Sequence, residues 1–455
     1  MGSWFKPTKA WGMIISLIIF TILCLVAGGG AILNLLFPLG SFAIGIYLYF
    51  SCPLLYIGFT WWLWFLTPFV RRLVDYQAGF TDPSPVLLSP ILVTFITVNS
   101  LWRNLPKAYN QKSLPFVLSM VGVIYGFVIG IFNRATVPLF IGLLDWFGPV
   151  IFAFYLFVNW RNYPAIKQNI QRVFSCAVLV TGIYGIIQYL IAPQWDRIWL
   201  IGTGLTTMGH PEPLGIRVWS TMNASGPFAN FMFAGLILLL SDRSILKIPA
   251  SIVGYLAFLL SLVRSAWGSW LIALTIFMTS VNLKYQIRLI LTLCFLIALV
   301  IPLANTEPFA EEISSRLETF GDLGGDGSAN ARQRTYSRLI STALTSFVGT
   351  GIGEMSLDNS LLDLLIYLGW IGTIFYLGGM IIVLLFIFQK SNSTDSFALS
   401  CRAIAMGIIL RLPLGPVIIE ANGLLLWSFL AMAAAAKMYH QNLAHKYNCR
   451  RKLTN

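Results

Sequence analysis

Residues 351–372 read GIGEMSLDNSLLDLLIYLGWIG, a glycine-rich turn that leads through Asp358 and Asn359 into an apolar run. The run continues to residue 388, and a helix needs about 20 apolar residues to cross the hydrocarbon core of a bilayer. The stretch therefore predicts a membrane helix with a carboxylate at its entrance. That carboxylate also has a purely structural interpretation, because Asp is a good helix N-cap.

The composition extends this interpretation to the whole chain. Of its 455 residues, 57% are hydrophobic and 10% are charged, and the mean hydropathy is +0.77. A soluble protein needs more polar side chains than this to cover its surface. We count about fourteen apolar runs of span length, of which the pairs within 31–70 and 396–436 are the least clearly separated. We therefore expect an all-α polytopic membrane protein with about 12–14 transmembrane helices.

The apolar runs also predict how the chain is organised. The opening run resembles a signal peptide, but its length and the many later runs favour an uncleaved first span. The expected parts are N-terminal transmembrane helices in 1–192, a first periplasmic loop in 193–222, central transmembrane helices in 223–304, a large periplasmic loop in 305–357, C-terminal transmembrane helices in 358–436 and a cytoplasmic tail in 437–455.

The two sides of the membrane are expected to carry different cations. With the N-terminus inside, every lysine falls on the cytoplasmic side, which follows the positive-inside rule and places both termini there. The net charge of +13 is then explained by topology and anionic lipid, without nucleic acid. The outer side carries arginines only: Arg71, Arg72, Arg134, Arg197, Arg217, Arg264, Arg316, Arg332, Arg334, Arg338 and Arg411.

Arginine differs from lysine in the way it binds anions. Its planar guanidinium grips a phosphate or a carboxylate with two hydrogen bonds. The outer side is therefore expected to bind an anion, unless these arginines lie at the interface or pair with Asp and Glu. Arg264 is notable because it lies where one span ends and the next begins. A charge at that depth is costly, so it indicates function unless the side chain snorkels to the headgroups.

Two outer loops are long enough to be functional. The first carries His210, Arg217 and, at its end, Asn223. The second is expected to form helices over 306–320 and 331–347. If the latter is helical, Arg334 and Arg338 are i, i+4 neighbours. The chain has no Cys-x-x-Cys, no Cys/His cluster and no dense Asp/Glu/His cluster, so its sequence predicts no disulfide framework and no metal site.

Three stretches, in this order, resemble the O-antigen ligase / O-antigen polymerase superfamily of bacterial envelope glycosyltransferases. They are RVWSTMNASGPFANFM at 217–232, SLVRSAWGSWLIAL at 261–274, and the segment 328–372, which resembles the long periplasmic loop of the family and the helix after it. Together they cover much of the C-terminal half. The first 190 residues match only as a series of hydrophobic helices.

The resemblance implies a GT-C-like fold in the bacterial inner membrane. It implies a metal-independent inverting glycosyltransferase without a cofactor, whose donor is an oligosaccharide on polyprenyl (undecaprenyl) pyrophosphate. The acceptor would be another lipid-linked glycan in an exopolysaccharide or O-antigen polymerase, which we favour, or a lipid A core in a ligase. Membrane lipids and envelope assembly proteins are the other expected partners.

The resemblance also assigns roles to residues. Arg217 and Arg264 would be catalytic, and Arg332, with Arg334 and Arg338 nearby, would bind the pyrophosphate, whose charge grows as the glycosidic bond breaks.

Many family members have His-Asn where this chain has Asp358-Asn359. Asn359 would contact the pyrophosphate, and Asp358 would replace the histidine as general base, because inverting transfer commonly uses a carboxylate. In the alternative, Asp358 is a cap that orients an arginine, and the base is another group such as Glu354 or is absent. His210 and Asn223 are further candidates.

Two rival functions remain at this level. Some members of the superfamily are assigned to solute transport, including bicarbonate-type uptake, and a missing histidine would fit a site with a new use. Transporters tend to show inverted repeats and helices broken at mid-membrane, and this sequence has no such repeat. A non-catalytic scaffold in an envelope complex is the other alternative.

Overall fold

The structure, a computed structural model, describes residues 7–109, 112–242, 244–281, 327–389 and 395–454, together with single residues between 283 and 298. All regular elements in these residues are helices, and two segments pair only through the single β-bridge Gly209–Ile216. The chain forms two compact units. Unit 1 takes its described residues from 1–96, 168–267 and 283–321, and unit 2 from 97–167, 268–282 and 322–455.

The predicted fold class is confirmed: the protein is all-α and polytopic. Among the described residues, nine helical segments are long and apolar enough to cross a membrane. Three shorter apolar helices, Ser225–Ser241, Lys247–Leu260 and Ser396–Ile409, add to them. The nine are Thr8–Val26, Gly30–Ser51, Pro53–Ala78, Pro85–Lys107, Leu114–Asn133, Thr136–Val158, Trp160–Ile191, Ser360–Phe388 and Glu420–Lys446.

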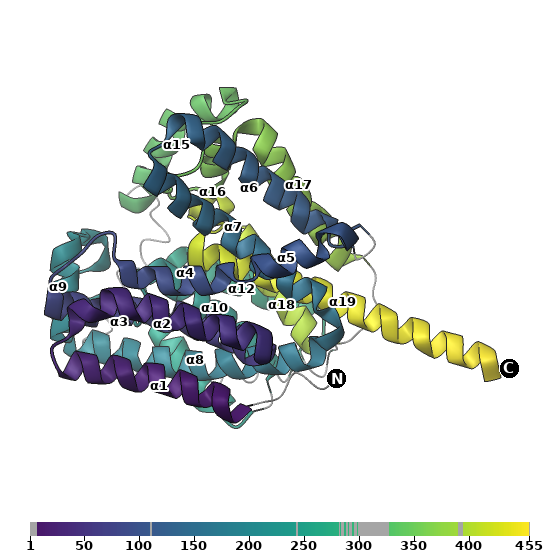
Figure 1. Cartoon of the computed structure of the whole chain (residues 1–455), viewed down its shortest axis with the longest axis horizontal. Helices are drawn as coiled ribbons and strands as arrows, with labels where there is room; N and C mark the ends of the chain where they lie inside the picture. Colours follow the sequence, from purple (N-terminus) through teal and green to yellow (C-terminus); the bar gives the residue numbers. More distant parts are fainter. Residues whose placement is uncertain are drawn as a thin grey trace. The chain divides into compact units, whose positions relative to one another are not determined.

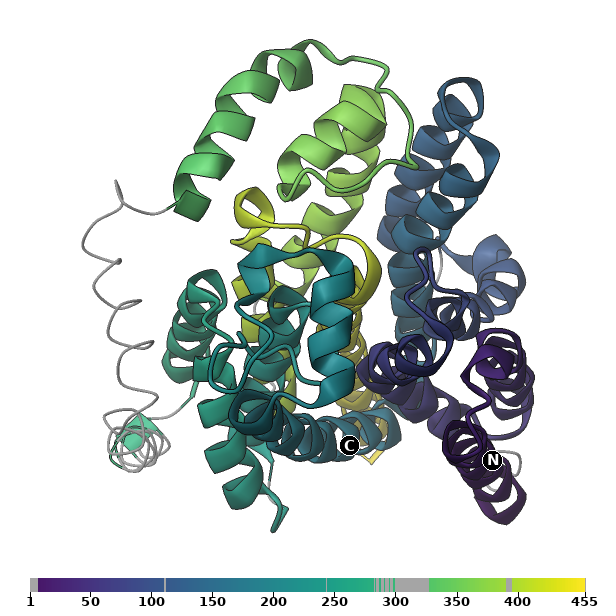
Figure 2. The ribbon, with the colours of Figure 1, turned by 90° about the vertical axis from the view of Figure 1, so that its left-hand side faces the viewer.

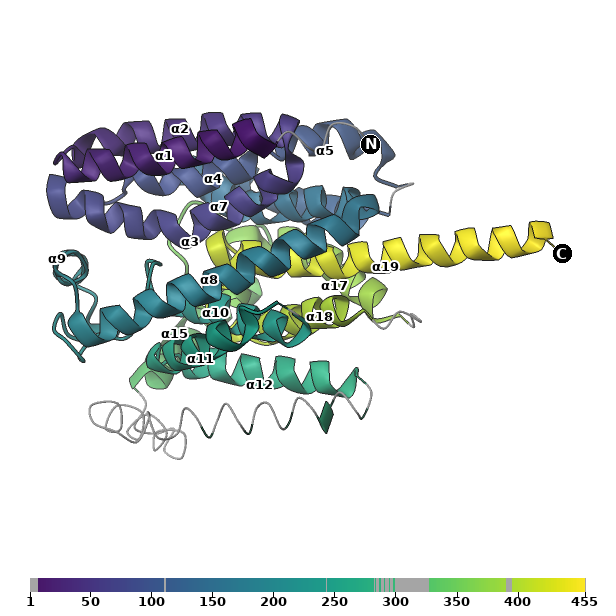
Figure 3. The ribbon, with the colours of Figure 1, turned by 90° about the horizontal axis from the view of Figure 1, so that it is seen from below.

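Unit 1 begins with three helices that lie side by side in Figures 1 and 3. These are α1 (Pro7–Val26), α2 (Gly30–Ser51) and α3 (Pro53–Ala78), and the short α4 (Leu88–Phe95) packs against α2 and α3. The unit also contains most of α8 (Tyr163–Ile191), and α9 (Gln194–Thr203), α10 (Ser225–Ser241) and α11 (Lys247–Leu260).

Aromatic side chains join α3, α8 and α10 in the interior of unit 1. Trp61 on α3 is fully buried and lies edge-on to Phe174 on α8 and Phe231 on α10, at ring-centroid distances of 5.0 and 5.9 Å. Phe65, one turn further along α3, contacts Phe231 at 5.0 Å. Aromatic rings bury large areas and prefer such edge-to-face contacts, so this cluster joins α3 to α8 and α10, the two helices on either side of residues 192–224.

Unit 2 is built around a stripe of glycines on α6 (Leu114–Asn133). Gly122, Gly126 and Gly130 are spaced four residues apart, and this spacing lets helix backbones approach closely. A methyl group at Gly122 would meet the backbone of Gly372 on α17 (Gly369–Phe388). At Gly130 it would meet the backbone of Ile352, in the glycine turn. The stripe therefore packs α6 against both α17 and the turn that precedes it.

Two further helices complete the core of unit 2. α7 (Thr136–Val158) and α19 (Glu420–Thr454) pack against each other, and α18 (Ser396–Ile409) packs on α19. Trp427 on α19 is fully buried and donates its indole N–H to the hydroxyl of Tyr376 on α17, at 2.7 Å. The buried polar ends of the two rings thus satisfy each other.

Several element bounds differ from those expected. The candidate span Pro85–Lys107, which the sequence predicts as one apolar run, consists of α4 and a separate α5 (Val98–Asn104). The last helix does not end near residue 436 but continues to Thr454, so the segment expected as a tail is helical, as Figure 1 shows. The helix expected over 331–347 is confirmed as α15 (Gly327–Thr345), whereas the one expected over 306–320 lies outside the described residues.

Candidate functional site

Arg217 links the first two stretches of the family resemblance. Its Nε donates to the carbonyl of Ser261 at 3.2 Å, and its Nη2 donates to the carbonyl of Leu262 at 3.0 Å. Its Nη1 donates to the carbonyl of Thr207 at 3.0 Å. The segment that begins at Arg217 therefore lies against the turn between α11 and α12 (Arg264–Thr279), within unit 1.

Arg264 is the first residue of α12, directly after this turn, and its side chain is half-buried. Leu262 in the turn has a φ of +53°, a left-handed conformation that turns the chain sharply between the end of α11 and the start of α12. The backbone N–H of Val218 donates to the carbonyl of Leu260 at 3.1 Å, beside the bonds from the Arg217 side chain. Two of the three arginines predicted to converge thus belong to adjoining segments.

The other two candidates of the first loop have different surroundings. His210 is exposed in a short hairpin, where its backbone N–H donates to the carbonyl of Gly215 at 2.8 Å. Asn223 lies just before α10, and its side-chain oxygen is buried without a hydrogen-bond partner among the described residues. An orphaned buried acceptor is costly and calls for a ligand or water. Of these two candidates, Asn223 is therefore the better placed to accept a hydrogen bond from the hydroxyl group of a ligand.

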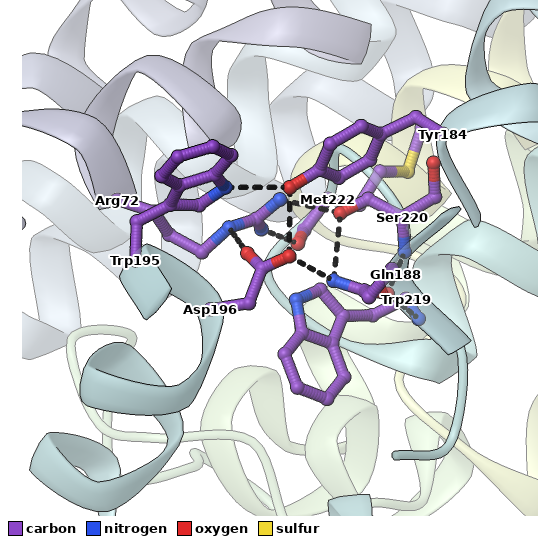
Figure 4. A network of polar contacts seen from close by, with 8 residues as sticks. All are labelled: Arg72, Tyr184, Gln188, Trp195, Asp196, Trp219, Ser220 and Met222. Carbon is purple, nitrogen blue, oxygen red and sulfur yellow. Dashed lines mark hydrogen bonds and ion pairs between the residues drawn. The ribbon is translucent and has the colours of Figure 1, made fainter. Parts of the chain in front are cut away.

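A buried polar network lies beside this segment and was not predicted (Figure 4). Arg72 on α3 and Asp196 on α9 form an ion pair at 2.7 Å with both side chains fully buried. Gln188 on α8 donates to Asp196 at 2.9 Å and accepts from the backbone N–H of Ser220 at 2.8 Å. The sequence placed Arg72 among the arginines expected on the outer side, but nothing in the spacing indicated its partners.

The entrance to the membrane in unit 2 is shaped by the glycine turn. Gly349, Gly351 and Gly353 have φ values of +86°, +88° and +111°, which only glycine adopts without strain. The N–H of Gly351 donates to the carbonyl of Tyr367, about two turns into the membrane segment, at 3.0 Å. The turn is thus packed between α6 and the membrane segment (Figure 2, in green), and its glycines serve packing.

The Asp358–Asn359 pair has a different division of roles from the one expected. Asn359 is the N-cap of α16 (Ser360–Asp363): it is buried, and its side-chain oxygen accepts the N–H groups of Leu361 and Leu362 at 3.0 and 3.2 Å. The alternative in which Asp358 caps the helix is therefore wrong. Asp358 itself is exposed, has a φ of +55°, and has no hydrogen bond or ion pair with any described residue.

Asp363 holds the loop that presents Asp358. Its carboxylate accepts the hydroxyl of Ser356 at 2.6 Å and the backbone N–H of Leu357 at 2.8 Å. The buried Asp363 therefore reaches back over the first turn, and it lies close enough to Asp358 for the two charges to repel each other. The loop is fixed at both ends, while the Asp358 carboxylate stays accessible.

Glu354, the alternative base, is already engaged. It forms an ion pair with Arg134, which lies between α6 and α7, and the second guanidinium nitrogen of Arg134 donates to the hydroxyl of Thr350 at 2.8 Å. The Glu354 carboxylate is thus occupied by Arg134, whereas the Asp358 carboxylate has no partner among the described residues. The geometry therefore favours Asp358 over Glu354 as the carboxylate that an acceptor hydroxyl can reach.

Two arginines on α15 present uncommitted guanidinium groups. Arg334 and Arg338 are exposed, and neither guanidinium has a hydrogen bond or ion pair with a described residue. By helical register these two positions lie about 40° apart around the helix, on one face. α15 packs against α16, so these cations belong to the same end of unit 2 as Asp358.

Most of the other described outer arginines bind protein groups. Arg71 pairs with Asp75 at 3.1 Å, and Arg197 donates to the carbonyls of Ile191 and Ala192 at the end of α8. Arg72, Arg134 and Arg217 are engaged as described above. Within the described residues, the candidates with exposed and uncommitted guanidinium groups are therefore Arg334 and Arg338.

Comparisons with protein-family models, with curated proteins and with solved structures each found no match to this chain. The first-loop candidates belong to unit 1, and Glu354, Asp358, Asn359 and the arginines of α15 belong to unit 2. The convergence of Arg217, Arg264 and Arg332 on one anion stays a prediction.

Proposed function

We propose that this protein is a membrane glycosyltransferase that polymerises glycan from a polyprenyl-pyrophosphate-linked donor. The observation that carries the proposal is Asp358: an exposed carboxylate without a partner among the described residues, held by the Asn359 cap and the Asp363 loop contacts at the entrance of a membrane helix. The loop around Asp358 is fixed, whereas the Asp358 carboxylate is exposed and has no partner among the described residues, and this combination suits a general base.

The proposed reaction uses Asp358 to activate the acceptor. A sugar hydroxyl transfers its proton to the Asp358 carboxylate as its oxygen attacks the anomeric carbon from the face opposite the pyrophosphate. The new C–O bond forms while the bond to the pyrophosphate oxygen breaks, and the electron pair leaves with the polyprenyl pyrophosphate. The configuration at the anomeric carbon is inverted.

The leaving pyrophosphate needs positive charge near it. Arg334 and Arg338 are exposed on the helix that packs beside α16, and two guanidinium groups one turn apart suit a diphosphate. In this proposal Arg264 and Arg217 serve the same donor from unit 1. Arg217 does so mainly by holding the α11–α12 turn, since three of its N–H groups bind backbone carbonyls.

The proposal places the protein in the bacterial inner membrane with both termini in the cytoplasm. The lysine and arginine distribution supports this orientation, because Asp358 and α15 then lie on the outer side with the lipid-linked donor.

The first test is deletion of the gene followed by analysis of the surface glycan. We expect long chains to disappear while single repeat units remain. Loss of all repeats from the lipid A core would indicate the ligase activity instead. Normal glycan would refute both enzyme activities, and a defect in bicarbonate uptake would then support transport.

The second test compares carboxylate variants in a turnover assay with purified lipid-linked oligosaccharide. We expect Asp358→Asn to reduce kcat by at least 100-fold, the usual scale for loss of a general base. Glu354→Gln should retain measurable turnover, and Asp82→Asn, in an exposed outer loop, serves as the matched control. Full turnover by Asp358→Asn would rule out the carboxylate base.

A further inference from the structure

We propose that Arg72, Asp196 and Gln188 are positioning residues that hold the segment 219–222 in a strained conformation and thereby fix Arg217 and Asn223 at its two ends. The inference builds on the proposed function, because the segment opens the first stretch of the family resemblance. All the residues belong to unit 1.

The strain lies at Ser220, whose φ is +52°. A residue other than glycine in this left-handed region costs about 1–3 kcal/mol, and such residues persist only where the surroundings over-determine them. Here the surroundings do so, because Gln188 accepts the Ser220 N–H, Arg72 binds the Ser220 carbonyl, and the Ser220 hydroxyl donates to the carbonyl of Thr181 at 2.5 Å. Every polar group of this strained residue therefore has a partner.

The guanidinium of Arg72 spans the segment (Figure 4). Its Nη1 donates to the carbonyl of Met222 at 2.5 Å, its Nη2 donates to the carbonyl of Ser220, and its Nε faces the Asp196 carboxylate. Lysine has no such fork, so it cannot bind two carbonyls and a carboxylate together in this geometry. Arg72 thus fixes the peptide groups directly before Asn223.

Asp196 and Gln188 orient Arg72 in turn. The second Asp196 oxygen accepts the hydroxyl of Tyr184 at 2.7 Å and the amide of Gln188 at 2.9 Å. Gln188 also accepts the backbone N–H of Trp219 at 3.1 Å. A fully buried ion pair adds little net stability over well-packed apolar side chains, because desolvation offsets its attraction. What this network adds is a fixed geometry for the backbone between Arg217 and Asn223.

The test separates positioning from stability by replacing the charged pair with apolar residues. Removing one partner leaves a buried charge, whereas Arg72→Met with Asp196→Leu removes both and keeps the volume. The neighbouring pair Arg71–Asp75 on α3 gives a matched control, since it is also buried but does not contact the segment. The control variant is Arg71→Met with Asp75→Leu.

Hydrogen exchange of the peptide 217–223 in the detergent-solubilised protein is the first readout. We expect at least tenfold faster exchange in the Arg72→Met/Asp196→Leu variant and unchanged exchange in the Arg71→Met/Asp75→Leu control. Equal exchange in the two variants would overturn the proposal. If the first variant does not fold, Gln188→Met, which is neutral and breaks the contacts to Trp219 and Ser220, is measured in the same way with the same two outcomes.

Turnover of the lipid-linked donor is the second readout. We expect the Arg72→Met/Asp196→Leu variant to stay folded but to lose at least tenfold in kcat/KM. The separate single variant Arg72→Lys should also lose kcat/KM, but by a smaller factor. A variant with fast exchange and full turnover would refute the positioning role. If the wild-type protein itself shows no turnover, the proposed function fails, while the exchange result still decides whether the network holds the segment.

Discussion

Replacing Gly351 with alanine tests whether the glycine turn is a packing element. The α carbon of Gly351 lies against the backbone of Gly130 on α6, and a methyl group there would meet Gly130 and Ile129 backbone atoms that cannot move aside. In addition, the φ of +88° is unfavourable for alanine. Two costs therefore add at this position: backbone strain and overpacking.

Gly204 separates these two costs. It has a φ of +64°, but no atom lies within 4 Å of the position that a methyl group would take. Gly204→Ala is therefore destabilised by backbone strain alone, by about 1–2 kcal/mol. Gly351→Ala is destabilised by the same strain and, in addition, by overpacking, which costs about 1–3 kcal/mol. The difference between the variants isolates the close approach of the turn to α6.

The assay is the thermal midpoint of the detergent-solubilised protein, followed by size-exclusion chromatography after heating. About 1 kcal/mol shifts the midpoint by about 2–4 °C in domains of about 150–250 residues, so we expect Gly351→Ala to melt about 2–12 °C below Gly204→Ala. Equal midpoints would show that the turn does not pack against α6 as described. Loss of turnover without a lower midpoint would assign the glycine a functional role instead.

Three further predictions concern the ends of unit 2. Burial alone would raise the pKa of Asp395, but hydrogen bonds from groups such as Lys167 outweigh it and hold this pKa below its usual value. The ionised carboxylate therefore stabilises the fold above about pH 4, and this stabilisation is lost as the pH falls further. At pH values below about 4, the thermal midpoint of the wild type should decrease, and that of Asp395→Asn should decrease much less. Arg334→Gln combined with Arg338→Gln should raise the KM for the donor at least tenfold in turnover assays, with an unchanged midpoint because both side chains are exposed. Asn359→Ala should cost about 0.5–2 kcal/mol through loss of the helix cap, seen as a lower midpoint, whereas Asn359→Asp should keep most of it.

The fold class was predictable because it depends on local quantities. The length and hydropathy of each apolar run are properties of neighbouring residues, and they predicted the long spans well. The division into α4 and α5 was not visible, because the segment Pro85–Lys107 as a whole is apolar enough to form one span. The extension of α19 to Thr454 was not visible either. Hydropathy predicts where an apolar run ends, but polar residues with good helix propensity can continue the helix beyond that point.

The candidate site was predictable only in part. Asp358 and Asn359 are adjacent and both favour N-cap positions, so the sequence could not decide which residue caps α16. The ion pair of Arg72 with Asp196 joins residues far apart in the chain, and Arg72 binds the Met222 carbonyl across 150 residues. Such contacts have no periodic signal.

The structure also changes what the arginines expected on the outer side mean. The sequence predicted an anion to be bound, unless these arginines lie at the interface or pair with Asp and Glu. Among the described residues, Arg72 and Arg217 instead bind several backbone carbonyls at once, and Arg134 joins a carboxylate to a hydroxyl. Loops near a membrane leave many carbonyls without partners, and a five-donor fork satisfies them better than a lysine does.

Arginine therefore serves the architecture of the described residues, and anion binding has to be judged residue by residue. Arg334 and Arg338 suit it best, because both are exposed and neither guanidinium has a hydrogen bond or ion pair with a described residue. Arg72 suits it least, because its guanidinium is buried and binds two backbone carbonyls and the Asp196 carboxylate. A substitution at Arg334 or Arg338 should thus change donor binding alone, whereas one at Arg72 should change the shape of the first outer loop.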